Sequence, residues 1–196
     1  MERRPEHEAK LLERLRAGDC RAFRELVEAY QDRLYDLLYR MLRNRAEAED
    51  ALQEVFLQAY RGLPRFDGRS SLYTWLYRIA TNVALMRLRR FRPSLISLED
   101  PPEAAAQEIQ ASLQTNATNP LAQVLADELR EQLDRWLEEL PPLTRLVFLL
   151  RDVEDLPIGE VAALTGQTEW AAKGRLKRAR AHVRNRLVAY MREQGR

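Results

Sequence analysis

The sequence predicts an all-α protein made of two small helical domains joined by a flexible acidic linker. Leu, Ala, Arg and Glu dominate the 196 residues and only 7 residues are glycine, a composition typical of helices. Apolar residues recur at helical spacing along most of the chain. Residues 93–119 lack such a stripe and are rich in Pro, Ser, Asn, Thr, Gln and acids, as in a tether. We therefore expect domains at 1–92 and 120–196.

Start and stop signals place four helices in each domain. In the first domain we expect a short and a long helix within 8–42, a third over about 46–60, and a fourth from Ser70 or Ser71 to about Arg90. Gly18 ends the first of these and Asp19 caps the second, while 62–64 stop the third. In the second domain we expect helices near 120–139, 143–153, 158–165 and 168–191.

Charge is strongly segregated along the chain, although the formal net charge is only +2. Between residues 61 and 92 there are eight Lys or Arg and one acid. Between residues 171 and 196 there are nine Lys or Arg and one acid. Residues 93–160 reverse this balance, with fourteen acids against four arginines. One basic block is ordinarily a solvated helix face, but two blocks on recognisable elements indicate two surfaces for a polyanion.

Several classes of protein are disfavoured. The charged N-terminus has no apolar stretch typical of a secretory signal, and no segment approaches a membrane span, so a cytoplasmic protein without membrane insertion is expected. Cys20 is the single cysteine, which excludes an internal disulfide and a thiolate metal cage. His7 and His182 lie far apart in sequence. We expect no metal and no cofactor.

The C-terminal pattern is that of a helix-turn-helix. A helix over 158–165 is followed by Gly166-Gln167 and then by a basic helix. The cations are expected on the side away from the buried face, where they can enter a major groove; they are Lys173, Arg175, Lys177, Arg178 and Arg180. A basic amphipathic helix lying on an acidic partner or a membrane is the alternative, which the preceding helix and tight turn disfavour.

The helix after Ser71 carries aromatic residues on two sides. Its buried face is expected to hold Leu72, Trp75, Leu76, Ile79, Val83 and Met86. Tyr73 and Tyr77 are expected to be exposed beside Arg69, Arg78, Asn82 and Arg87, a mixture of rings and cations that suits single-stranded nucleic acid. The loop 66–71 before the helix could receive a flipped base through its backbone and hydroxyl groups. Tyrosines with exposed tips are also common in ordinary cores.

A helix between these two elements gathers acidic residues. Glu47, Glu49, Asp50 and Glu54 raise the hypothesis of a metal-dependent nuclease using Glu47, Asp50 and Glu54. Against it, no histidine lies nearby, and the helix dipole explains acids in a first turn. A docking face for a basic partner helix is favoured.

Together these residues resemble a known family. The stretch AEDALQEVFLQAYRGLPRFDGRSSLYTWLYRIATN, followed by LPIGEVAALTGQTEWAAKGRLKRAR, is similar to the extracytoplasmic-function (ECF) class of bacterial sigma factors, the specificity subunits of RNA polymerase. The resemblance covers nearly the whole chain, with region two at about 22–90 and region four at about 120–190. It implies a DNA-binding protein without catalysis of its own. The alternative is a two-domain helix-turn-helix regulator that binds duplex DNA without polymerase.

The resemblance also implies roles for individual positions, to which we add neighbours on the same elements. Residues expected to bind the clamp helices of core RNA polymerase are Asp50, Gln53, Glu54 and Phe56. Residues expected at the melted minus-ten DNA are Phe66, Asp67, Gly68, Arg69, Ser70, Ser71, Tyr73, Trp75, Tyr77, Arg78 and Asn82. Residues expected at the minus-thirty-five duplex are Thr168, Trp170, Lys173, Gly174, Arg175, Lys177, Arg178 and Arg180.

Two positions depart from the family pattern, which usually has a small residue at Trp170 and commonly serine or another side chain at Gly174. A glycine inside a helix costs about 1 kcal/mol relative to alanine, which suggests that DNA comes close at Gly174. Packing of Trp170 on the preceding helix is favoured over contact with a thymine methyl or a sugar. The resemblance further implies that helices within 121–153 hold the polymerase flap and that an anti-sigma factor restrains the free protein.

Overall fold

The computed structural model describes residues 5–91 and 120–194, and all regular structure in these two ranges is helical. The chain divides into two compact units, residues 1–93 and 94–196. The linker expected at 93–119 lies outside the described residues.

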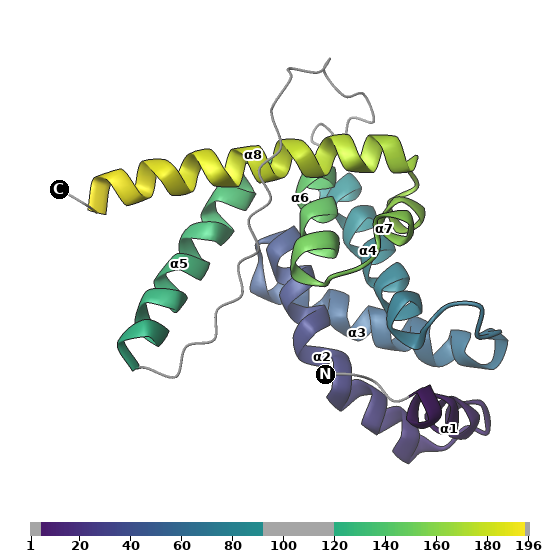
Figure 1. The fold of residues 1–196 in the computed structure, drawn as a ribbon. Helices are drawn as coiled ribbons and strands as arrows, with labels where there is room; N and C mark the ends of the chain where they lie inside the picture. The colour runs from purple at the N-terminus through teal and green to yellow at the C-terminus, as the bar shows by residue number, and fades with distance from the viewer. Residues whose placement is uncertain (1–4, 92–119, 195–196) are drawn as a thin grey trace. The chain divides into compact units, whose positions relative to one another are not determined.

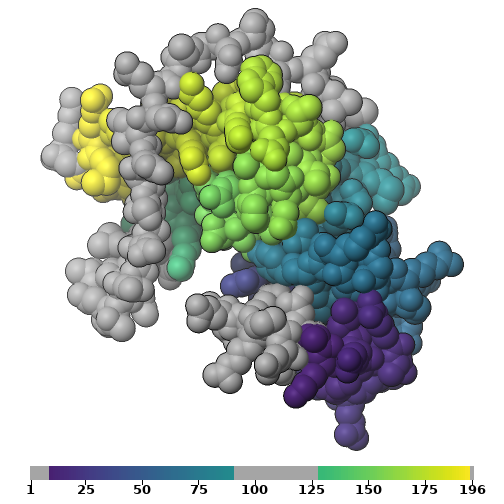
Figure 2. Space-filling view, turned by 45° about the vertical axis from the view of Figure 1, so that its right-hand side comes forward, coloured from purple at the N-terminus to yellow at the C-terminus, as the bar shows by residue number. Residues whose placement is uncertain are grey.

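The first unit is a bundle of three helices with a fourth, short helix against it. Its elements are α1 (Pro5–Arg16), α2 (Cys20–Leu42), α3 (Arg45–Gly62), the 3-10 turn η1 (Leu63–Arg65) and α4 (Leu72–Phe91). Helices α2, α3 and α4 contact one another in all three pairings, and α1 contacts α2 and η1. The space-filling view shows α1, in purple, against the blue residues of the same unit (Figure 2). Each of the three long helices is therefore covered on two sides.

Local chemistry places the helix ends where the sequence predicts them. Gly18 has φ +77°, a left-handed conformation that ends α1, and the Asp19 carboxylate accepts the backbone N–H of Arg21 at 2.8 Å. At the start of α4 it is Ser71 rather than Ser70 that caps the helix, because its hydroxyl accepts the Thr74 N–H at 3.0 Å. These bonds satisfy donors that have no partner inside a helix.

In the second unit, three shorter segments pack along one long helix (Figure 1). The elements are α5 (Pro120–Glu138), α6 (Pro142–Phe148), the π-helical turn η3 (Leu149–Val153), α7 (Ile158–Thr165) and α8 (Glu169–Gln194). The single helix expected over 143–153 is thus an α-helix that widens into a π-turn. The first half of α8 crosses α6 and α7, and its last turns extend beyond them.

A buried arginine joins the first two helices of this unit. Arg145 is only 8% exposed, and its guanidinium donates to the carbonyls of Leu137 at 2.8 Å, Glu138 at 2.8 Å and Leu140 at 3.3 Å. The Leu137 and Glu138 carbonyls lie in the last turn of α5 and have no partner within that helix, and the Leu140 carbonyl follows it. Arg145 therefore serves as a cap for a helix that precedes it in sequence.

Candidate nucleic-acid interface

One face of α3 combines polar and apolar side chains. Asp50 and Gln53 are exposed, as a docking face requires. Leu57 and Tyr60 continue the same face at spacings of four and three residues, and they are 56% and 54% exposed. Sequence reasoning missed these two, although the spacing from Gln53 could have revealed them. The ring of Phe56 is half-buried and packs edge-on against Phe23 of α2, with 6.5 Å between centroids.

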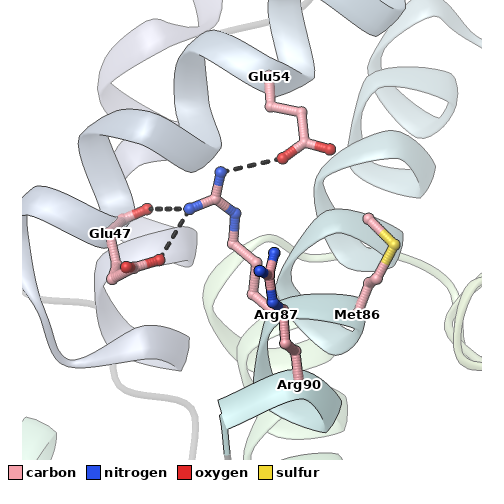
Figure 3. Close-up of a pocket in the computed structure, with 5 residues that line it drawn as sticks. All are labelled: Glu47, Glu54, Met86, Arg87 and Arg90. Carbon is pink, nitrogen blue, oxygen red and sulfur yellow. Dashed lines mark hydrogen bonds and ion pairs between the residues drawn. The ribbon is translucent and has the colours of Figure 1, made fainter.

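Two acids of α3 are held by a cation from α4. The Arg87 guanidinium donates to the Glu47 carboxylate at 2.8 Å and to the Glu54 carboxylate at 3.0 Å (Figure 3). Burial lowers the pKa of Arg87, but hydrogen bonds to Glu54 and then Glu47 outweigh this effect and the net pKa is raised. These three residues line a surface pocket together with Met86 and Arg90. Glu54, expected to bind polymerase, is thus already ion-paired within the unit.

The loop between η1 and α4 is a compact turn. The Asp67 carboxylate accepts the Arg69 N–H at 3.2 Å and pairs with the Arg69 side chain, while Gly68 has φ +77°. The pKa of Asp67 is lowered, chiefly by the hydrogen bond that its carboxylate accepts from the Arg69 backbone N–H. Phe66 is only 6% exposed because its ring packs on Trp75 with 4.9 Å between centroids. Phe66 therefore anchors the loop, and its exposed side chains are those of Asp67, Arg69 and Ser71.

An exposed row runs along α4 from this loop. Trp75 is half-buried between Phe66 and Gly62, and Arg78 and Asn82 follow it as exposed side chains on the same side of the helix. Met86 extends the row and is 53% exposed, so its expected place on the buried face is wrong. The row offers one ring edge, one cation and one amide next to the loop.

The expectation that both tyrosines of α4 are exposed is wrong for Tyr77. Its ring is fully buried, and Tyr73 is half-buried between Tyr77 and Tyr30, with centroids 4.4 Å and 6.2 Å away. The cause is that α4 packs against both α2 and α3, which covers a second side of the helix. Tyr77 is therefore a core residue.

The turn of the helix-turn-helix is well defined. Gly166 has φ +67°, and the Thr168 hydroxyl accepts the Ala171 N–H at 3.2 Å to cap α8. Arg175 was expected to face DNA, but it is 4% exposed and donates to the Gln167 side-chain oxygen. That expectation is wrong for Arg175, because its position lies on the side of α8 that packs against the turn.

The first two turns of α8 present a separate, accessible face. Trp170 is 75% exposed, so the favoured expectation that it packs on α7 is wrong. Lys173 and Lys177 are exposed on the same side, at spacings of three and four residues. Between them lies Gly174, where an added Cβ would meet only the Arg178 guanidinium, at 4.0 Å. The packing of the described residues therefore gives no reason for a glycine at this position.

Arg180 lies on another side of α8. Its guanidinium makes two hydrogen bonds to the Asp152 carboxylate, at 2.8 and 2.7 Å, and these bonds raise the pKa of Arg180. The pair joins α8 to η3. Among the eight residues expected at duplex DNA, Arg175 and Arg180 thus make contacts that hold the unit together.

Comparisons with known proteins agree with this arrangement. Residues 26–92 match the family model of sigma-70 region 2, and residues 130–183 match that of sigma-70 region 4. The chain is 31% identical to the ECF RNA polymerase sigma factor SigW of Bacillus subtilis, over 91% of this chain and 95% of SigW. The chain belongs to the ECF sigma factors of the sigma-70 family.

Other members of the family match over nearly the full length of this sigma factor. It is 36% identical to the ECF sigma-E factor of Escherichia coli K12, covering 93% of this chain and 95% of that factor. It is 34% identical to the sigma-H factor of Pseudomonas aeruginosa, covering 96% and 97%. Among solved structures, CnrH in complex with the cytosolic domain of CnrY shares the fold, with a TM-score of 0.63, 24% identity and coverage of 93% and 97%.

Membership of this family establishes an RNA polymerase sigma factor, and sigma factors are not enzymes. The nuclease hypothesis gains no support from the site, since Arg87 holds Glu47 and Glu54. Within residues 5–91 and 120–194, no three His, Cys, Asp or Glu side chains are grouped to hold a metal ion. In the same ranges, no helix has both the length and the apolar character to cross a membrane.

Proposed function

We propose that this sigma factor divides promoter recognition between its two units. In the first unit, the α3 face binds core RNA polymerase, and the loop 66–71 with the row on α4 binds the opened minus-ten strand. In the second unit, the first turns of α8 read the minus-thirty-five duplex. The observation that carries the proposal is the row of half-buried Trp75 and exposed Arg78 and Asn82 beside the loop.

The polymerase contact is supported by the composition of the α3 face. Asp50 and Gln53 supply hydrogen-bonding groups to a partner helix, and exposed Leu57 and Tyr60 supply apolar area. Interfaces commonly combine an apolar centre with a polar rim. The clamp helices of the largest polymerase subunit are the proposed partner, with the flap held by helices of the second unit.

The minus-ten contact is supported by the chemistry of single-stranded DNA. Unpaired bases offer flat faces for stacking and edges for hydrogen bonds, while phosphates need cations. Trp75 presents part of its ring, Asn82 can pair with a base edge, and Arg69 and Arg78 supply charge. Gly68, with φ +77°, lets the chain turn tightly, and the exposed backbone of this turn is the proposed contact for a flipped base. Tyr73 contributes only its half-exposed ring.

The minus-thirty-five contact is supported by the accessible face of α8. Helix-turn-helix proteins place the N-terminal residues of their second helix against base edges. Trp170 and Lys173 stand at that end, and Lys177 can reach a phosphate from the next turn. Gly174 lets the DNA approach the helix backbone closely. Arg178 and Thr168 flank this face.

We also propose that the protein works in the cytoplasm beside RNA polymerase, has no enzymatic activity, and is restrained by an anti-sigma factor. CnrH, which shares the fold, was solved with the cytosolic domain of CnrY. The exposed Leu57 and Tyr60 of the α3 face suit a protein partner that competes with polymerase.

The test is a reconstitution of the full chain with bacterial core polymerase on genomic DNA fragments. The wild-type protein should bind core and direct initiation at defined promoters. Asn82→Ala should reduce open-complex formation about tenfold, the effect of one or two lost hydrogen bonds, and leave core affinity within about twofold. Gln31→Ala, which removes an exposed amide from α2, is the matched control and should behave as wild type. Absence of both core binding and promoter-dependent initiation would refute the proposal.

A further inference from the structure

Helix α1 precedes the segment that matches sigma-70 region 2, which begins at residue 26. Sequence reasoning assigned it no role beyond the bundle. In the structure, α1 contacts α2 and also η1, the turn that leads into the loop 66–71 (Figure 1). Its last turn therefore lies beside the loop that is proposed to bind a flipped base.

The contact to the loop is made by one cation. The Arg16 guanidinium donates to the backbone carbonyl of Phe66 at 2.5 Å, across 50 residues of sequence. The same guanidinium covers Gly68, because a Cβ placed there would lie 3.7 Å from Arg16 Nη2 and 3.9 Å from Leu12 Cδ2. The end of α1 thus touches the loop on both sides of Asp67.

This bond orients a peptide plane of the loop. The peptide that joins Phe66 to Asp67 is planar and trans, so its carbonyl and its N–H point in opposite directions. Because the carbonyl points to Arg16, the Asp67 N–H points away from α1. The Phe66 ring on Trp75 and the bond from Arg69 N–H to the Asp67 carboxylate hold the flanking parts of the turn.

We infer that Arg16 is a positioning residue for capture of the flipped minus-ten base. The inference rests on the proposed function of the loop 66–71 and adds the group that sets its geometry. A loop ordered before binding does not lose conformational freedom when the base enters, so preorganisation favours capture. Arg16 itself contacts the loop backbone and need not contact DNA.

Arg14 provides a matched comparison within the same turn of α1. Its guanidinium pairs with Asp19 at 2.9 Å and with Glu25 at 3.0 Å, both in or next to α2. Arg14 therefore fastens α1 to the bundle, whereas Arg16 reaches the loop. Replacing each by glutamine removes the same charge from the same helix and separates the two roles.

The first test uses the free protein and does not depend on polymerase. Hydrogen exchange of backbone amides over residues 63–71 should be about tenfold faster in Arg16→Gln than in wild type. Arg14→Gln should leave these amides within about twofold, and circular dichroism should show that both variants keep their helices. Equal exchange in Arg16→Gln and wild type would overturn the inference, as would equal acceleration in both variants.

The second test measures base capture in the holoenzyme. On a promoter used by the wild type, 2-aminopurine replaces one adenine of the nontemplate minus-ten strand, and its fluorescence rises when the base leaves the stack. Arg16→Gln should lower the equilibrium constant for this change about tenfold, the effect of one charge-assisted hydrogen bond. Core affinity should stay within about twofold.

Arg16→Lys can still donate to the Phe66 carbonyl. It should recover at least half of the loss, measured as the logarithm of the equilibrium constant for base capture. Equal losses in the lysine and glutamine variants would overturn the role of the hydrogen bond. Normal base capture in Arg16→Gln despite faster loop exchange would overturn the link between loop order and capture. Wild-type holoenzyme that produces no fluorescence change would instead refute the proposed function of the loop.

Discussion

The two units differ in which of their aromatic residues are buried and which are exposed. In the first unit, Tyr77 was expected at the surface and is fully buried, while in the second unit Trp170 was expected to pack and is 75% exposed. Helix α4 lies between two other helices, so side chains on two of its sides enter the core. The first turn of α8 follows a tight turn at one end of its unit. The place of a helix in its bundle, more than the residue type, decides which rings are accessible.

Substituting these two aromatic residues is expected to have the largest effect, and it tests the comparison most directly. Tyr77→Ala should lower the free energy of unfolding of the first unit by about 3–5 kcal/mol, because it removes a buried ring. Trp170→Ala should change stability by no more than about 0.5 kcal/mol. Urea unfolding of the full chain, followed by circular dichroism, measures both. A stable Tyr77→Ala protein with defective promoter melting would show that the ring contacts DNA after all.

Arginine and lysine on α8 allow the same contrast between buried and exposed residues in one helix. Arg175→Ala should destabilise the second unit by about 2 kcal/mol, since it leaves the Gln167 oxygen without its cation. Lys177→Ala should keep full stability but weaken binding of the holoenzyme to duplex minus-thirty-five DNA, with the salt slope reduced by about one. Chemical unfolding and fluorescence anisotropy at several salt concentrations distinguish them. Identical DNA defects with unchanged stability would contradict the structural role of Arg175.

The smallest expected effect tests whether the Trp170 ring contacts a thymine methyl. If its ring contacts a thymine methyl, replacing thymine by deoxyuridine at that position removes one buried carbon and should weaken wild-type binding by about 0.8 kcal/mol. Trp170→Ala should show no such penalty. The measurement is holoenzyme affinity for duplexes that carry the substitution at one thymine at a time. Equal penalties for wild type and variant at every thymine would exclude this contact.

The helix ends could be predicted because their causes lie within a few residues. Gly18, Asp19 and Ser71 act through their own backbone conformation or a bond to a residue two or three positions away. The π-turn at Leu149–Val153 and the cap by Arg145 could not be predicted, because both depend on packing between helices. Periodicity indicates that a helix has a buried side, but it does not say how many neighbours cover the helix.

The same limit applies to the candidate site. Sequence reasoning identified the loop 66–71 and the exposed Asn82, since turn residues and polar spacing are local signals. It assigned Arg175 to DNA, because charge alone does not show that a guanidinium faces a side chain across the turn. It missed Arg16, whose partner lies 50 residues away. Contacts between residues distant in sequence account for the differences between the predicted site and the arrangement of these residues in the structure.

The ion pairs of Arg87 tie the helix proposed to dock on polymerase to the helix proposed to hold an opened strand. A polymerase cation that takes Glu54 must compete with Arg87, so the free energy of docking includes that of releasing part of α4. Because thermodynamic linkage is reciprocal, a ligand that stabilises one position of α4 also changes the affinity of α3 for RNA polymerase. If both proposed contacts form, the ion pairs of Arg87 couple polymerase docking on α3 to strand binding on α4.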